Sequence, residues 1–219
     1  MKSKDEMAGK IESTLLRADA SRLEVEMLCA EAVRLGLFGV CVAPSRILDA
    51  KEHLTGSGVK VVTVIGFPLG NTTSNAKLAE VEDALALGAD ELDIVMNIGH
   101  FLDGRFADVE RELQRAKNAV GDKVLKVILE TGYLGEGQII HAGRLALEAG
   151  ADFLKTSTGF GPRGASVEDV RLLSSVAGEK AGVKASGGIK TMARAIEMIG
   201  AGATRIGTSS AGAIMLELG

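Results

Sequence analysis

Eight short apolar runs alternate along the chain with stretches of helical periodicity, and this alternation restricts the possible folds most strongly. The runs cover residues 11–16, 38–43, 59–65, 91–97, 124–130, 152–156, 183–185 and 204–207. Between them, apolar residues recur at helical spacing, most clearly over 23–35 and 78–87. Ser21 and Ser166 open capping-box sequences that predict helix starts. Strands alternating with helices form a parallel sheet, so the sequence predicts an α/β protein.

The eight units favour a closed (β/α)₈ TIM barrel over an open doubly wound sheet. A barrel gathers its active site from the carboxyl ends of several strands, whereas an open sheet concentrates ligand groups near one switch point. Reactive side chains occur near the ends of at least four of the runs. A length of 219 residues fits one barrel. We therefore predict a single domain over 1–219, with residues 1–10 forming an N-terminal helix or extension.

Four glycines mark a repeated unit of helix, turn and strand. Gly36, Gly88, Gly150 and Gly202 each follow a helical stretch and precede an apolar run. A left-handed C-terminal cap requires a residue of this kind. The residues five positions later are Cys41, Asp93, Lys155 and Gly207. If the turns are alike, these four positions share a similar place and facing on their strands.

The composition argues against several classes of function. The net charge is −4, and aromatic residues make up 3% of a chain without tryptophan. With its basic residues scattered, such a chain is not expected to present a nucleic-acid face or a base-stacking platform. No pair of its cysteines and histidines has the spacing of zinc ligands. We expect neither a metal nor another cofactor.

The N-terminal charges are not followed by an apolar stretch, so a secretory signal is not predicted. No apolar segment approaches the length of a membrane span. We therefore expect a cytoplasmic protein that binds neither nucleic acid nor membrane. In that compartment Cys29 and Cys41 are expected to remain free thiols.

Two lysines and an aspartate supply the candidate chemistry. Strand alternation lets Asp93, Lys155 and Lys184 all face the barrel interior. A lysine amine titrates near about 10.4, but burial and a neighbouring ammonium both favour its neutral, nucleophilic form. A neutral Lys155 would attack a carbonyl and form a Schiff base, while Asp93 and Lys184 transfer protons. We predict amine catalysis.

The alternative role for an inward lysine and aspartate is a structural ion pair. Because Asp93, Lys155 and Lys184 all lie at strand ends, catalysis is favoured over that alternative. For Lys126, a structural pair near the bottom of the barrel is preferred. For Cys41, core packing is preferred over lining the site. His100 and His141 are expected at the surface.

Two glycine-containing loops after the last two runs have the composition of a phosphate cradle. They span residues 186–190 and 207–212. Barrels often bind phosphate with the loops after the last two strands and a helix N-terminus. Glycine lets backbone amides approach the anion, and serine hydroxyls add donors. The alternative is that both loops are simple turns.

Five segments together resemble the 2-deoxyribose-5-phosphate aldolases, class I aldolases of the DeoC family. They are VIGFPLG at 64–70, ELDIVMNIG at 91–99, KVILET at 126–131, FLKTSTGF at 153–160 and VKASGGI at 183–189. The match extends from residue 11 nearly to the C-terminus. The resemblance implies a TIM barrel that reversibly cleaves 2-deoxy-D-ribose 5-phosphate to acetaldehyde and D-glyceraldehyde 3-phosphate through a lysine Schiff base.

The resemblance also implies roles for individual residues. Lys155 matches the Schiff-base lysine, and Asp93 and Lys184 match the proton-transfer pair. The substrate and phosphate set comprises Thr14, Thr158, Gly159, Gly187, Gly188, Gly207, Ser209 and Ser210. Glu12 matches a position near the sugar hydroxyl. The family implies a homodimer or homotetramer that acts in deoxyribonucleotide catabolism without a metal.

The chain departs from the family pattern at three places. The first run reads Glu-Ser-Thr at 12–14 where some members have Asp-His-Thr, and the single tyrosine is Tyr133, whereas some members carry a tyrosine in a C-terminal tail. Phe160 stands where some members have a lysine, and Lys190 is the candidate to replace that phosphate partner. The alternative functions are a Schiff-base aldolase for another sugar phosphate and a non-catalytic phosphate-binding barrel.

Overall fold

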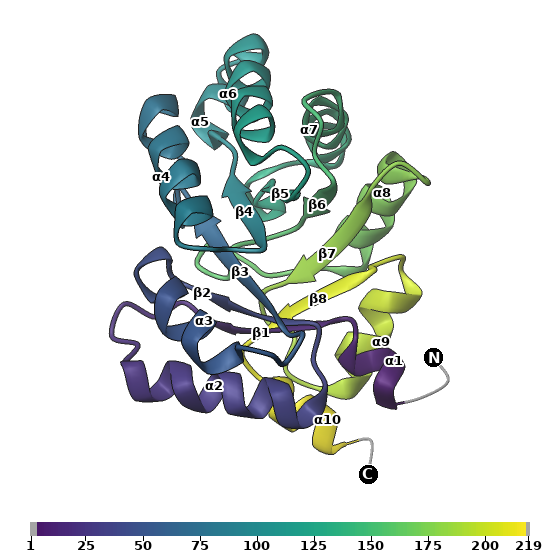
Figure 1. Ribbon diagram of the computed structural model, residues 1–219. Helices are drawn as coiled ribbons and strands as arrows, with labels where there is room; N and C mark the ends of the chain where they lie inside the picture. The colour runs from purple at the N-terminus through teal and green to yellow at the C-terminus, as the bar shows by residue number, and fades with distance from the viewer. Residues whose placement is uncertain (1–3, 218–219) are drawn as a thin grey trace.

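The computed structural model describes residues 4–217 and shows eight parallel strands closed into a barrel (Figure 1). The strands are β1 (Ile11–Leu15), β2 (Gly39–Val42), β3 (Lys60–Ile65), β4 (Glu91–Val95), β5 (Val124–Ile128), β6 (Phe153–Lys155), β7 (Gly182–Ser186) and β8 (Arg205–Thr208). Each strand pairs with the next, and β8 pairs with β1 to close the ring. The predicted TIM barrel is confirmed, because each predicted run overlaps one strand.

Helices surround the barrel (Figure 1). They are α1 (Lys4–Ala8), α2 (Arg22–Leu35), α3 (Ile47–Leu54), α4 (Ser74–Ala86), α5 (Ile98–Leu102), α6 (Phe106–Val120), α7 (Glu136–Glu148), α8 (Val167–Ala177), α9 (Met192–Gly200) and α10 (Ala211–Leu216), with 3₁₀ turns η1 (Pro44–Arg46) and η2 (Thr131–Tyr133). The helices predicted over 23–35 and 78–87 correspond to α2 and α4. Within residues 4–217, no helix combines the length and hydropathy of a membrane span.

The predicted helix starts are present. Ser21 forms the full capping box with Glu24, and the Ser166 side chain accepts a hydrogen bond from the Asp169 N–H. The N-terminal helix expected within residues 1–10 is α1, whose Met7 is fully buried. Residues 1–3 of that expectation lie outside the described part of the chain.

The repeated helix ending is also confirmed. Gly36, Gly88, Gly150 and Gly202 have φ values of 63°, 95°, 93° and 113°. In each unit the residue after the glycine donates its N–H to the carbonyl five positions earlier, as Leu37 does to Ala32. This 6→1 bond belongs to the Schellman ending. Because these four helices end in the same way, the chain enters the strand that follows each of them along a similar path.

The molecule has an apolar layer outside the strands and a charged interior inside them. The apolar layer joins strand residues such as Val40 and Ile94 to helix residues such as Val25 and Val81. Burial of this surface stabilises the fold by about 25 cal/mol per Å². The barrel interior instead encloses Glu12, Asp93, Lys126 and Lys184, all of them fully buried. The interior therefore holds the candidate site.

Candidate active site

Asp93 on β4 lies at the centre of the buried charges. Its Oδ2 accepts hydrogen bonds from Lys155 Nζ at 2.8 Å and Lys184 Nζ at 2.7 Å, and its Oδ1 accepts one from Lys126 Nζ at 2.8 Å. Burial alone would raise the pKa of Asp93, but the three ammonium groups outweigh burial and hold this pKa well below its ordinary value. Asp93 is therefore an ionised carboxylate that joins both candidate lysines.

Lys155 and Lys184 are direct neighbours, because their Cα positions pair across β6 and β7. Burial lowers the pKa of the Lys155 ammonium, and the charge of Lys184 adds to this effect against the opposing effect of Asp93. For Lys184, Asp93 and Glu12 together outweigh burial and raise the pKa above its ordinary value. Lys155 is thus the lysine that loses its proton more easily, as a nucleophilic amine must.

A lower level of charges continues toward the amino ends of the strands. Glu12 accepts hydrogen bonds from Lys184 and, at 2.8 Å, from Arg205. Lys126 pairs with Glu91 at 2.7 Å, and Arg205 lies 3.3 Å from Glu91. The predicted structural pair of Lys126 is present, although the same ammonium also contacts Asp93. Glu12 was expected near a sugar hydroxyl, yet it lies within this network because its carboxylate engages cations below the pocket.

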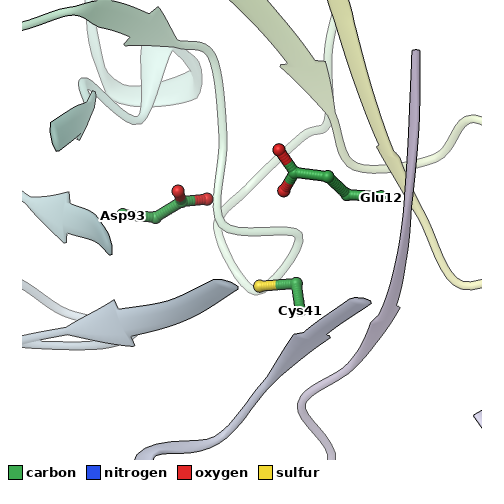
Figure 2. A group of neighbouring side chains, drawn as sticks. All are labelled: Glu12, Cys41 and Asp93. Atoms are coloured by element: carbon green, nitrogen blue, oxygen red, sulfur yellow. The ribbon is translucent and has the colours of Figure 1, made fainter. Parts of the chain in front are cut away.

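Cys41 on β2 points its thiol toward Glu12 and Asp93 (Figure 2). The ligand atoms of these three residues lie within 4.8 Å of one another, a spacing that a metal ion could use. Both carboxylates are already paired with cations, and burial raises the pKa of Cys41 to about 11, so the thiol is protonated. The group therefore does not fit a metal site. Cys41 packs with Val62 and Val64, in line with the preferred prediction.

A pocket of about 340 Å³ opens above Lys155 at the carboxyl ends of the strands. Seven of the predicted binding residues line it, namely Thr14, Thr158, Gly159, Gly187, Gly188, Gly207 and Ser209. Ser210 is not among the lining residues, and its N–H donates to Thr208 Oγ1 at 2.9 Å. Asp93 and Lys184 also do not line the pocket. They lie behind Lys155, where they can exchange protons with it.

The loop after β7 approaches the loop after β6 closely. Gly187 and Gly188 have φ values of 88° and 75°, and residues other than glycine rarely adopt such a backbone conformation. A Cβ atom at Gly187 would lie 2.9 Å from the Cα of Gly164. The glycines of this predicted phosphate loop are therefore required by the backbone path beside the pocket.

Besides Lys155, two basic residues line the pocket, and the sequence identified one of them. Lys190 was the candidate charge partner, and it is exposed on the pocket wall. Arg17 was missed, although its position directly after the first apolar run was a usable signal. Arg17 pairs with Asp19 at 2.6 Å and also with Glu24, so its charge is already compensated. Lys190 is thus the better candidate to meet an anion.

The closed barrel, with a lysine of lowered pKa below a pocket, defines a barrel enzyme that works through a buried amine. The chain belongs to the DeoC/LacD family aldolases, whose family model matches residues 10–216. That match spans every strand of the barrel.

Several relatives are similar over nearly their whole length. The deoxyribose-phosphate aldolase of Dictyoglomus turgidum is 50% identical over 214 residues, which cover 98% of each chain. That of Aciduliprofundum boonei is 51% identical over 207 residues, or 93% of each chain. The tetrameric deoxyribose phosphate aldolase of Aeropyrum pernix superposes with a TM-score of 0.91 at 36% identity, covering 99% of this chain and 92% of that one.

Proposed function

We propose that this protein is a deoxyribose-phosphate aldolase that reversibly cleaves 2-deoxy-D-ribose 5-phosphate to acetaldehyde and D-glyceraldehyde 3-phosphate. The observation that carries the proposal is Lys155, which lies at the pocket and shares the carboxylate of Asp93 with Lys184. The family membership and the names of the relatives point to the same reaction. Both alternatives, an aldolase for another sugar phosphate and a non-catalytic barrel, lack such support.

The reaction begins with the neutral amine of Lys155, which attacks the aldehyde carbon of the open-chain sugar. The resulting carbinolamine loses water and becomes a protonated imine. The imine then accepts the electron pair of the C2–C3 bond, while the C3 hydroxyl gives up its proton and leaves as the aldehyde of glyceraldehyde 3-phosphate. An enamine of acetaldehyde remains on Lys155.

Protonation of the enamine carbon and hydrolysis of the new imine release acetaldehyde and restore the amine. Asp93 can accept and return protons because its Oδ2 contacts both lysine amines. Lys184 keeps its own proton more firmly than Lys155, so it serves as the acid partner. The two residues thus relay protons to the reacting carbons, directly or through water.

The phosphate end of the substrate would lie against the glycine loops after β7 and β8. Gly187, Gly188, Gly207 and Ser209 line this side of the pocket, and Lys190 adds a positive charge. An open-chain pentose phosphate then extends from these loops to Lys155. The loops hold the sugar so that its aldehyde meets the amine.

Trapping of a covalent intermediate tests this function. Borohydride added with 2-deoxyribose 5-phosphate should reduce the imine and attach the substrate or acetaldehyde carbon skeleton to Lys155. Intact-mass and peptide mass spectrometry measure the adduct and its position. The absence of an adduct from a protein that releases triose phosphate would contradict the imine route. Equal cleavage of fructose phosphates would contradict the substrate assignment.

Lys190 should contribute to affinity for the phosphate group. Lys190→Gln is expected to raise KM for deoxyribose phosphate about tenfold, the effect of one charged hydrogen bond, with kcat nearly unchanged. Arg17→Gln is the matched comparison, because Arg17 lines the same pocket but is paired with Asp19 and Glu24. Steady-state kinetics of the two variants measure the difference. A larger KM effect for Arg17→Gln would reverse the assignment.

The assembly is proposed to be a homodimer or homotetramer in the cytoplasm. The Aeropyrum pernix relative is a tetramer. Leu23 and Met27 on α2 are each 63% exposed, and Leu48 on the adjacent α3 is 60% exposed. Such an apolar surface across two packed helices is suited to contact with another subunit.

A further inference from the structure

Glu130 has an unusual backbone. It follows β5 and has φ 50° and ψ 62°, the left-handed conformation. Across residues 4–217, no other non-glycine residue has a positive φ. Residues with a side chain rarely adopt the left-handed region. Strained residues of this kind persist where the surrounding structure fixes them, and they are concentrated at functional sites.

The carboxylate of Glu130 holds the segment that follows β6. Glu130 is 1% exposed, and its Oε2 accepts a hydrogen bond from the Thr158 N–H at 3.1 Å and another from the Thr158 hydroxyl. The chain then folds closely over the carboxylate, because a Cβ atom at Gly161 would lie 2.7 Å from Glu130 Cδ. We call residues 156–166 the β6 loop.

The backbone on either side of Glu130 strengthens this attachment. The Leu129 N–H donates to the Lys155 carbonyl at 3.0 Å, and the Thr131 N–H donates to the Thr156 carbonyl at 2.9 Å. The Thr158 hydroxyl in turn accepts a hydrogen bond from the Phe160 N–H at 3.0 Å. A chain of contacts therefore runs from Glu130 through Thr158 to Phe160.

The β6 loop forms one wall of the pocket. Thr158, Gly159 and Phe160 line it beside Lys155. The strand that carries Lys155 has only three residues, so contacts beyond its end must fix the path of the chain to the wall. The other carboxylate oxygen of Glu130, Oε1, is buried without a hydrogen-bond partner. An unpaired buried oxygen and a left-handed backbone both reduce stability, which indicates that this arrangement is retained for the site.

We propose that Glu130 is a positioning residue, which holds the β6 loop so that the substrate phosphate and the amine of Lys155 are presented at a fixed separation. The proposal rests on the proposed aldolase function. It goes beyond that function by assigning a role to a glutamate that does not line the pocket over Lys155. Its effect should fall mainly on phosphorylated substrates, because the Ala165 N–H of the β6 loop donates to the carbonyl of Gly187, in the loop proposed to meet the phosphate, at 3.1 Å.

The experiment compares cleavage of 2-deoxyribose 5-phosphate with cleavage of unphosphorylated 2-deoxyribose. Glu130→Ala is expected to lower kcat/KM for the phosphorylated sugar about 100-fold, the cost of a misplaced reacting group, and to lower it for the free sugar much less. Glu130→Gln keeps the size and one acceptor oxygen, so it should restore much of the activity. Thr158→Val keeps the N–H but loses the hydroxyl, so it should fall between the two.

Glu136, an exposed glutamate at the start of α7, supplies the control. Glu136→Ala should leave both activities unchanged. Equal losses on both sugars in Glu130→Ala, accompanied by a lower melting temperature, would show a structural role only and overturn the positioning role. A wild-type protein that cleaves neither sugar would overturn the proposed function itself, a result distinct from the first.

Discussion

Replacement of Lys155 by methionine is expected to abolish deoxyribose phosphate cleavage while the barrel stays folded. Methionine has nearly the same length but cannot form an imine. Loss of the catalytic nucleophile should reduce kcat by at least about 10⁴-fold. Borohydride should then trap no adduct at this position. Triose phosphate release, measured with a coupled assay, and mass spectrometry give the two readouts.

The fold should tolerate this change because of the charge balance inside the barrel. The network contains three carboxylates, from Glu12, Glu91 and Asp93, and four cations, from Lys126, Lys155, Lys184 and Arg205. Removing Lys155 leaves three of each sign. The thermal midpoint of Lys155→Met should therefore equal or exceed that of the wild type, because no buried charge is left unpaired.

Lys180→Met is the control for this experiment, since Lys180 is exposed and lies outside the charge network. It should keep full activity and full trapping. If Lys155→Met retained activity within tenfold of the wild type, another group would have to be the nucleophile, and the imine assignment would fail.

The parts of the site that could be predicted from the sequence are those that local patterns specify. Strand parity and the repeated glycine ending place Asp93 and Lys155 on the inner face, and both patterns are local. The contacts of Glu12 with Lys184 and Arg205 join residues 172 and 193 positions apart across the closed ring. No local pattern specifies how far these long side chains reach, so only the structural pair of Lys126 was predicted from this lower level of charges.

The left-handed backbone of Glu130 and the place of Arg17 at the pocket were not predicted, for related reasons. The left-handed backbone at Glu130 follows no turn sequence that requires it, and it arises from contacts with a loop almost thirty residues away. Arg17 directly follows the first apolar run, and the pairing of β1 with β8 in the closed barrel brings it beside the loop after β8 at the pocket. Ser210 was assigned from its motif, and its N–H instead turns to Thr208. Tertiary packing decides these positions.

Replacement of Lys184 by leucine should move the pH dependence of the reaction upward and slow it. Lys184 lowers the pKa of Lys155, while Asp93 raises it. Without Lys184 the network has three carboxylates and three cations, and one of these cations is Lys155 itself. The charged form of Lys155 is then favoured, so its pKa should rise. Loss of the acid partner should also reduce kcat by about 10² to 10⁴-fold.

The sign of this shift depends on the form that reacts. Only the neutral amine attacks, and its fraction falls as the pH drops below the pKa of Lys155. A higher pKa therefore moves the acid limb of the kcat/KM profile to higher pH. Profiles of the wild type, Lys184→Leu and the surface variant Lys180→Leu measure it, and Lys180→Leu should match the wild type. An unchanged acid limb in Lys184→Leu would mean that burial alone sets the pKa of Lys155, and that the neighbouring ammonium only transfers protons.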